Sequence, residues 1–346
     1  MTESERFTVT VEQDGTFGVP AYVLRDHAAG SRARVLPALG NSLTSFVVAL
    51  PDRELEVMLR PQPEDRSPRP THYGNPILFP FPNRVRKGVF RFQGHTYRLD
   101  VNTAEGHHNH GLVRDRAWQV EQASATPRGA LVRSSFQGER SADVMRQFPF
   151  PFTLSVAYTL RGNALRFDAA VRNTGSRAMP MGLGIHPYFR LPLYAGGRPT
   201  DCRLQIPAAR LWALDGEKLP TGRVEAVPPA LDFRVPRRMS EAELDHVFSD
   251  LVRVEEVATC RLQDQLAGAE VLVRFGPEFP FLVVYAPADR PTLCFEPYTC
   301  LTDAANLAER GVASGLTVLP AGGSWRGSVL FAVSALPQVR AAQPAS

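Results

Sequence analysis

Strict alternation of apolar and polar residues, interrupted by a short turn, governs the middle of this chain. Between positions 152 and 160, Phe, Leu, Val, Tyr and Leu occupy every second position, and the alternation resumes from 165 to 171 after Arg161-Gly162-Asn163. A period of two residues is that of a β-strand with one buried face. The segment therefore predicts an antiparallel hairpin packed on a core.

Further strands are predicted on both sides of this hairpin. Residues 89–92 and 97–101 flank Gln93-Gly94 as a second hairpin, and short apolar runs typical of strands occur at 281–285, 292–295 and 328–333. Thirty prolines and 26 glycines separate the strands at short intervals, which favours a sandwich over an α/β protein. We expect an all-β fold with few short helices, one domain over residues 1–337 and a flexible tail over 338–346.

One short helix is predicted within this β-rich chain. Ser240 and Glu243 form a capping-box pattern, and four apolar residues follow at helical spacing: Leu244, Val247, Phe248 and Leu251. Residues 60–71 contain four prolines and are predicted to form a surface loop.

Charge and cysteine usage exclude several classes of protein. The net charge of +4 comes from scattered arginines, so nucleic acid is not an expected partner. The N-terminus lacks a signal-peptide pattern and no apolar run could span a bilayer, so we expect a cytoplasmic protein without a membrane partner. The four cysteines lack CxxC spacing and are expected to be reduced thiols, neither a disulfide framework nor a zinc site.

Three short segments carry residues suited to acid–base chemistry. His186 lies in Gly184-Ile185-His186-Pro187-Tyr188-Phe189, Glu296 ends the apolar run that precedes Pro297, and a histidine cluster spans 107–110. Each segment leaves a predicted strand beside Pro or Gly. The combination suggests a general acid and a general base that face each other across a cleft.

Each of these residues also has a structural interpretation. His186 could be a core histidine bonded to the backbone, and Glu296 a strand-end carboxylate that faces water. The cluster at 107–110 could be a solvated turn or, since 108 and 110 would share a face of a strand, a metal site. No nearby Cys or HxxxH pattern completes a zinc shell there, which makes a metal the weaker alternative.

Five motifs in order resemble the aldose 1-epimerase, galactose mutarotase-like, family. They are Phe79-Pro80-Phe81-Pro82-Asn83-Arg84-Val85, His110-Gly111, His186-Pro187-Tyr188-Phe189, Leu244-Asp245-His246-Val247-Phe248 and Glu296-Pro297. The resemblance covers roughly residues 15 to 335, and residues 315–320 resemble the closing strand of the family. It implies a super-β-sandwich with a groove for one pyranose.

The resemblance also implies roles for individual residues. His186 would protonate the ring oxygen, Glu296 would take the proton from the anomeric hydroxyl, and His110 would be the second histidine of the site. Arg84, with Asn83 before it, and Asp245 would bind sugar hydroxyls. The alternatives are that Arg84 is an ordinary surface arginine and that Asp245 is a solvent-facing carboxylate. The expected partner is a small-molecule sugar, with no metal, no cofactor, and a monomer or homodimer as the assembly.

The chemistry of a cyclic hemiacetal fits such a pair. Ring opening removes a proton from O1 and delivers one to O5, and both an imidazole and a carboxyl group can be tuned toward neutrality for this work. The predicted function is aldose 1-epimerase, an isomerase that interconverts the α and β anomers of a free aldose such as glucose or galactose. A non-catalytic sugar-binding or sensor protein of the same fold is the alternative. A glycosidase is disfavoured because only one carboxylate is strongly placed.

The sequence departs from the family pattern at positions that bear on which sugar is the substrate. The chain has His110-Gly111-Leu112 where many members have HGG, and Ile185 and Arg190 flank the histidine motif. Arg190 or Arg114 could face a phosphate or sulfonate, because a planar guanidinium suits such groups. An anionic sugar is therefore an alternative substrate, although the sequence favours a neutral aldose.

Overall fold

The computed structural model describes residues 3–61, 69–239 and 244–336. Its α-helices are short: α1 (Glu3–Arg6), α2 (Ala142–Gln147) and α3 (Ala304–Glu309). Within these ranges no helix is long and apolar enough to cross a membrane. Nearly all other regular structure is strand, which confirms the all-β prediction.

The largest sheet has nine antiparallel strands. In spatial order they are β11 (Gln119–Thr126), β12 (Gly129–Gln137), β13 (Phe152–Arg161), β14 (Ala164–Asn173), β28 (Ser324–Ala335), β24 (Ala269–Phe275), β23 (Ala258–Asp264), β18 (Cys202–Gln205) and β21 (Arg237–Arg238). The strand β13–β14 hairpin is the one predicted from alternation, with Phe152 opposite Asn173 and Arg161 opposite Ala164.

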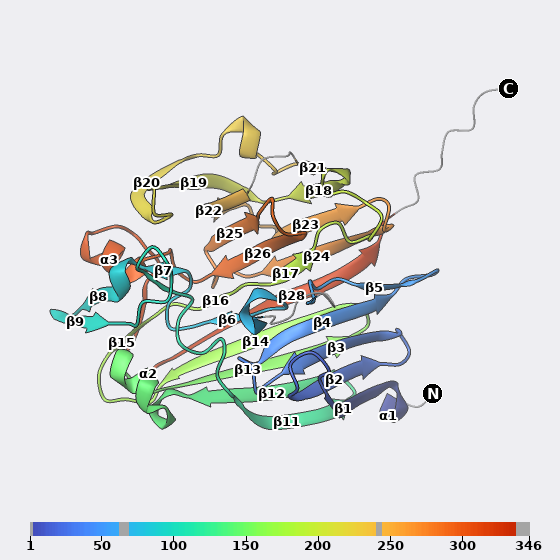
Figure 1. Cartoon of the computed structure of the whole chain (residues 1–346), viewed down its shortest axis with the longest axis horizontal. Helices are drawn as coiled ribbons and strands as arrows, with labels where there is room; N and C mark the ends of the chain where they lie inside the picture. The colour runs from blue at the N-terminus through green and yellow to red at the C-terminus, as the bar shows by residue number, and fades with distance from the viewer. Residues whose placement is uncertain (1–2, 62–68, 240–243, 337–346) are drawn as a thin grey trace.

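Two further sheets lie side by side in front of the nine-stranded sheet (Figure 1). One has eight strands: β20 (Pro220–Ala226), β19 (Ala208–Leu214), β22 (Leu244–Leu251), β25 (Phe281–Ala286), β26 (Thr292–Tyr298), β16 (Gly184–Ile185), β6 (Ile77–Leu78) and, paired with β26, β17 (Tyr188–Arg190). The other has five: β1 (Phe7–Gln13), β2 (Pro20–Asp26), β3 (Ser31–Leu36), β4 (Ser42–Ala49) and β5 (Glu54–Glu56).

Short two-stranded ribbons complete one end of the sandwich. They are β8 (Val89–Phe92) with β9 (His95–Arg98), β7 (Arg84–Val85) with β10 (His108–Asn109), and β15 (Met179–Met181) with β27 (Thr317–Leu319). The β8–β9 hairpin was predicted from the sequence. Its turn residues Gln93 and Gly94 have positive φ angles of 49° and 77°, as the turn of a two-residue hairpin requires.

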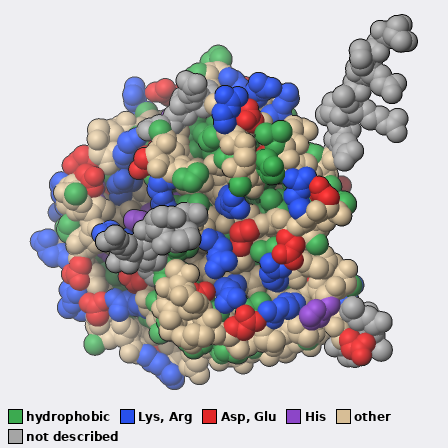
Figure 2. All heavy atoms as spheres, turned by 45° about the vertical axis from the view of Figure 1, so that its right-hand side comes forward, with side chains coloured by type: hydrophobic (Ala, Val, Ile, Leu, Met, Phe, Trp, Pro, Cys, Tyr) green, Lys and Arg blue, Asp and Glu red, His purple; other side chains and the backbone are tan. Residues whose placement is uncertain are grey.

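One contiguous core joins the three large sheets into a single domain. The apolar positions of the alternating hairpin belong to it, because Phe152, Leu154, Val156, Tyr158 and Leu160 are all fully buried. On the face shown in Figure 2, acidic and basic side chains are interspersed and form no single basic stripe.

The predicted helix at 244–251 is wrong, because these residues form strand β22. Their apolar positions suit either structure, but β22 pairs with β19 on one side and β25 on the other, so the sheet supplies its backbone hydrogen bonds. Ser240 and Glu243 lie outside the described residues, as do positions 62–68 of the predicted loop and the predicted tail at 338–346.

Candidate active site

Strand β26 brings Glu296 to one face of the eight-stranded sheet. Side chains alternate across a strand, so Cys294, Glu296 and Tyr298 share a face while Leu293 and Phe295 point into the main core. Two small apolar clusters flank Glu296 on its own face. One includes Tyr298, Val283 and Trp212, and the other joins Cys294 to Tyr188 and Leu59.

Glu296 is a buried carboxyl group with two close polar partners. It is 1% exposed, and the Tyr298 hydroxyl donates a 2.5 Å hydrogen bond to its Oε2. Its Oε1 lies 3.4 Å from Nε2 of His186. Burial raises the pKa of Glu296 well above its usual value, while the Tyr298 hydrogen bond opposes that shift.

His186 lies between β16 and β17, both of which pair with β26. Its backbone N–H donates to the carbonyl of Pro76, and its ring stacks on Tyr188 with centroids 4.3 Å apart. Burial lowers the pKa of His186 to about 3, and the charges of Arg114 and Arg290 add to the shift. Burial therefore favours the neutral imidazole, and the carboxylate of Glu296 is the neighbouring charge that would stabilise the imidazolium.

His110 lies beside this pair but is oriented by a turn rather than by a strand. The strand β10 ends at Asn109, and His110 adopts a left-handed φ of 69° that turns its ring edge-on to His186, with centroids 5.3 Å apart. Burial, followed by the charge of His186, lowers the pKa of His110 well below its usual value. A neutral His110 can donate or accept a hydrogen bond but is a poor proton source.

The other two histidines of the cluster have structural partners. His108 is buried, and its Nδ1 lies 2.7 Å from the carbonyl oxygen of Asp100. His107 is fully buried, and its Nδ1 accepts from the N–H of Lys87. His108 and His110 therefore do not share a strand face. Among the described residues, the atoms that could together hold a metal ion belong instead to His186, Cys294 and Glu296, which lie within 4.8 Å of one another.

Asn83 and Arg84 approach Glu296 from strand β7. The Asn83 side chain, in a left-handed backbone conformation with φ of 60°, accepts from the N–H and Nη1 of Arg84 and also bonds to the Tyr298 hydroxyl. The positive charge of Arg84 lowers the pKa of Glu296. Within the described residues, Arg84 Nε is buried without a hydrogen-bond partner, as are Nδ1 of His110 and Nδ1 of His186. Such unpaired buried groups are costly and are typical of ligand-binding positions.

Asp245 occupies the same sheet face two strands away. It lies opposite Tyr285 on β25, which in turn lies opposite Cys294 on β26. Its carboxylate forms an ion pair with Lys218, at 3.3 Å, and its negative charge raises the pKa of Glu296. The structure thus brings all six predicted site residues to one region, although Asp245 arrives there on a strand instead of a helix.

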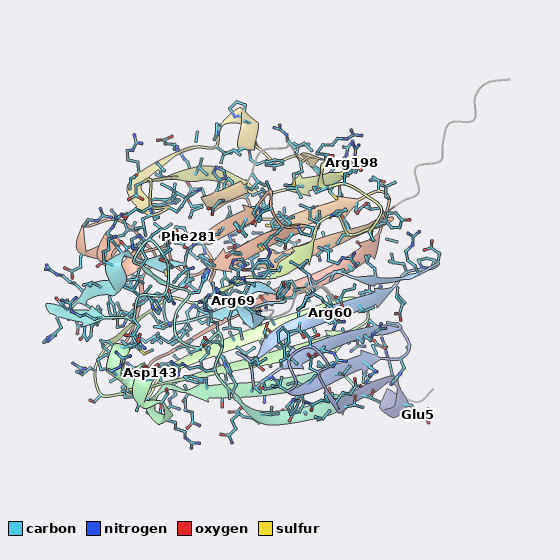
Figure 3. The ribbon with its side chains drawn as sticks, viewed as in Figure 1. Glu5, Arg60, Arg69, Asp143, Arg198 and Phe281 are labelled. Carbon is cyan, nitrogen blue, oxygen red and sulfur yellow. The ribbon has the colours of Figure 1, made fainter. Side chains whose placement is uncertain are left out.

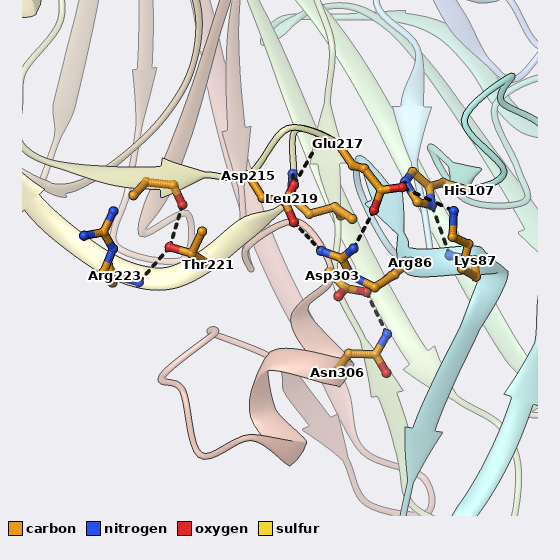
Figure 4. A network of polar contacts seen from close by, with 11 residues as sticks. Arg86, Lys87, His107, Asp215, Glu217, Leu219, Thr221, Arg223, Asp303 and Asn306 are labelled. Carbon is orange, nitrogen blue, oxygen red and sulfur yellow. Dashed lines mark hydrogen bonds and ion pairs between the residues drawn. The ribbon is translucent and has the colours of Figure 1, made fainter.

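A polar network holds β7 in place next to the site (Figure 4). Arg86 forms ion pairs with Asp215 and Glu217, which lie in the β19–β20 turn, at 2.5 and 2.6 Å. The N–H of Arg86 donates to the buried Asp303 carboxylate, and the N–H of Asp303 donates to the carbonyl of Arg84. This network fixes the backbone that carries Asn83 and Arg84.

Four residues of the site were not identified from the sequence: Tyr188, Tyr285, Cys294 and Tyr298. Strand alternation alone could have found two of them, because Cys294 and Tyr298 lie two residues on either side of Glu296. Tyr285 required knowledge of strand pairing, since its neighbour on β26 is Cys294.

A broad groove of about 1190 Å³ lies elsewhere, on the outer face of the nine-stranded sheet. Its lining includes Ser155, Thr159, Arg166 and Arg326, and none of the predicted site residues. It holds no histidine and no buried acid–base pair, so the chemistry suggested by the sequence does not belong there.

Comparisons with known proteins identify the family to which this chain belongs. The aldose 1-epimerase family model matches residues 21–332. The Escherichia coli protein YihR is 28% identical over 68% of this chain and 72% of its own length. Human galactose mutarotase is 31% identical over 55% of this chain and 51% of its own length.

Solved structures share the fold. A galactose mutarotase-like protein from Clostridium acetobutylicum has a TM-score of 0.82 at 24% identity, and the match covers 96% of this chain and 100% of that one. Galactose 1-epimerase from Lactobacillus acidophilus has a TM-score of 0.74 at 21% identity over the same shares of the two chains. The family match extends over nearly the whole sandwich and includes every residue of the acid–base region. The chain therefore belongs to the aldose 1-epimerase family.

Proposed function

We propose that this protein is an aldose 1-epimerase that interconverts the α and β anomers of a free aldose. The observation that carries the proposal is the buried pair of Glu296 and His186, whose Oε1 and Nε2 atoms lie 3.4 Å apart. The anomeric hydroxyl and the ring oxygen are bonded to the same carbon atom. An acid and a base that serve both oxygens must therefore lie close together, as these two groups do.

The proposed reaction transfers one proton in each direction. Glu296, as the carboxylate, takes the proton from O1 while His186, as the imidazolium, gives its proton to O5, and the C1–O5 bond breaks to leave an open-chain aldehyde. Rotation about the C1–C2 bond presents the other carbonyl face. On ring closure His186 recovers a proton from O5 and Glu296 returns one to O1, so the enzyme ends as it began.

The environment of the pair supports these roles. Burial disfavours the charged forms of both groups, whereas attraction across 3.4 Å between an imidazolium and a carboxylate would favour them, so each residue supplies the charge that stabilises the reactive form of the other. Groups whose surroundings shift their pKa values in this way are typical of acid–base sites. Asn83, Arg84, His110 and Asp245 are proposed to bind the sugar hydroxyls.

Polarimetry of freshly dissolved α-glucose and α-galactose tests the proposal. The wild-type protein should accelerate the approach to the equilibrium rotation in proportion to its concentration, beyond the buffer-catalysed rate. The competing function is a non-catalytic sugar-binding or sensor protein, which predicts saturable sugar binding by calorimetry without faster anomer exchange. Binding without acceleration for both hexoses and for their 6-phosphates would overturn the proposal.

A further inference from the structure

Three arginines around the acid–base pair have no carboxylate partner within the described part of the chain. They are Arg84, Arg114 and Arg290. Some arginines elsewhere, such as Arg86, Arg146 and Arg261, do form ion pairs with Asp or Glu. The carboxylate of Asp245, whose charge also acts on Glu296, is already paired with Lys218. Among the described residues, none of the three guanidinium groups is therefore neutralised by an ion pair.

Arg290 is held against the rings beside His186. Its guanidinium carbon lies 5.4 Å from the ring centroid of Tyr188 and 5.3 Å from that of Tyr73, and its Nη2 donates to the carbonyl of His72. Tyr188 in turn stacks on His186. Arg290 comes from the turn between β25 and β26, so the sheet that carries Glu296 also fixes this cation.

Arg114 contributes a second cation from the segment after His110. It is half-buried, and its charge acts on His186, His110 and His72. Burial lowers the pKa of its own guanidinium and the charge of neighbouring Asp115 opposes that shift, so negative charge on a bound ligand would stabilise the cation further. The exposed Arg69, labelled near the middle of Figure 3, adds a further positive charge on the side of His72.

The position of these cations relative to His186 indicates which part of a sugar they would meet. In the proposed reaction His186 serves the ring oxygen, and the carbon on the far side of that oxygen from C1 is C5, which carries C6. Arg290 lies on the Tyr188 side of His186, whereas Arg84 is held beside Glu296 through Asn83 and Tyr298. A group on C6 would therefore extend toward Arg290 and Arg114.

We propose that Arg114 and Arg290, beside Tyr188, form a subsite for an oxyanion on C6 of the sugar, so that the preferred substrate is an anionic aldose. This inference rests on the proposed function and narrows its substrate class. Two guanidinium groups suit a phosphate, a sulfonate or a carboxylate, since each offers several acceptor oxygens to planar donors. Arg190, the other arginine that the sequence suggested, lies on β17 opposite Thr292 and on the same sheet face as Tyr188.

Anomer exchange with matched substrates tests the subsite. Glucose, glucose 6-phosphate and glucuronate should be compared by exchange NMR in wild type, Arg114→Gln, Arg290→Gln and Arg290→Lys. Exposed Arg172, on β14, provides the control variant Arg172→Gln with the same change in net charge. We expect wild type to prefer a charged sugar over glucose by tenfold or more in kcat/KM, about the strength of one charge-assisted hydrogen bond.

The variants should remove that preference without removing glucose exchange. Removal of either charge also raises the pKa of His186 and so affects exchange of both kinds of sugar. Arg114→Gln and Arg290→Gln should therefore each lower kcat/KM about tenfold more for the charged sugar than for glucose, and Arg290→Lys should fall between. The losses should shrink at high salt, because screening weakens the attraction. Glucose exchange also shows that each variant is folded. The larger loss for glucose 6-phosphate or for glucuronate identifies the oxyanion.

A binding measurement separates this inference from the proposed function. Titration calorimetry with glucose 6-phosphate should give a dissociation constant that rises about tenfold in Arg114→Gln and Arg290→Gln but not in Arg172→Gln. If binding weakens in this way but the wild type catalyses no anomer exchange, the epimerase activity is rejected while the anion subsite is supported. Two results would overturn the subsite. One is a wild-type kcat/KM for glucose at least as high as that for both charged sugars, and the other is an equal loss of kcat/KM for charged and neutral sugars in the two variants.

Discussion

At the scale of single residues, the environment of Glu296 decides whether the site can work near neutral pH. The carboxyl group is buried, which favours its protonated form, and three interactions adjust that preference. The Tyr298 hydroxyl and the charge of Arg84 lower its pKa, while the charge of Asp245 raises it. A general base must be deprotonated before it can accept a proton, so each of these neighbours affects the rate at acidic pH.

Removing the Tyr298 hydroxyl should therefore displace the acidic limb of the pH–rate profile. In Tyr298→Phe the carboxylate loses its 2.5 Å hydrogen bond, so its pKa should rise and activity should appear only at higher pH. We expect kcat/KM at pH 6 to fall about tenfold or more, the scale of one hydrogen bond to a charged group. Tyr158→Phe is the control, because this buried hydroxyl instead contacts Asn75. An unshifted acidic limb would show that Tyr298 does not act on Glu296.

At the scale of elements, two site residues lie just outside the ends of short strands. Asn83 precedes β7 and His110 follows β10, where the backbone can leave the strand conformation. Asn83 and His110 both adopt left-handed backbone conformations, and the N–H of His110 donates to the carbonyl of Asn83. Gly111 follows with φ of 69°, and a Cβ atom there would lie 2.2 Å from the carbonyl oxygen of Phe79. The close approach of these two segments requires glycine at this position.

Substitution of Gly111 tests that close approach. Gly111→Ala should destabilise the protein by about 3 kcal/mol or more in urea unfolding and lower kcat, because relief of the collision moves His110. The control is Gly94→Ala, whose φ of 77° is similar but whose Cβ would meet nothing within 4 Å, so only about 1 kcal/mol of backbone strain should appear. Equal losses for the two variants would contradict the steric account.

The polar network next to β7 is testable with a similar pair of substitutions. Asp303 is 4% exposed and accepts from the N–H of Arg86 and from Asn306, so Asp303→Gly should cost about 1–3 kcal/mol of unfolding free energy and raise KM. Glycine tolerates the φ of 59° at this position. The exposed Asp250, with φ of 50°, gives the matched control Asp250→Gly, which should leave KM unchanged. If KM is unchanged in Asp303→Gly as well, the network does not contribute to substrate binding.

At the scale of the whole molecule, buried histidines make stability depend on pH. Burial is the chief cause that lowers the pKa values of five histidines: His72, His108, His110, His186 and His246. In the folded chain without a sugar these groups favour the neutral form, while in the unfolded chain they bind protons below about pH 6.5. Their contribution to stability is present above that pH and is lost as the pH falls toward their folded-state values. Glu296 and Asp303, whose pKa values are raised chiefly by burial, act in the opposite direction.

Five histidines with lowered pKa values against two carboxyl groups with raised ones predict a net loss of stability on mild acidification. The free energy of unfolding in urea should fall by about 2 kcal/mol between pH 7 and pH 5. In His108→Gln, which lies outside the acid–base pair, the fall should be smaller because one proton-binding group of the unfolded chain is gone. A wild-type stability that is constant or rises between pH 7 and pH 5 would contradict this balance.

Strand pairing across the whole molecule decides structure that a local sequence pattern cannot predict. Strand alternation was sufficient for the β13–β14 and β8–β9 hairpins, because their signals are local. It failed at β22, where apolar residues at 244, 247 and 248 suit a helix and only the neighbouring strands β19 and β25 decide otherwise. The same dependence on pairing hid Tyr285, while the turn at His110 could not be derived from a strand pattern.

The central claim is that Glu296 and His186 together catalyse anomer exchange. Exchange NMR should be recorded on the most efficient aldose with wild type, Glu296→Gln and His186→Asn, at matched protein concentration and with thermal unfolding as a check on folding. We expect each substitution to lower kcat by roughly a hundredfold or more, with sugar binding retained, and each variant to lose one limb of the bell-shaped pH profile. Near wild-type exchange in both variants would contradict the account.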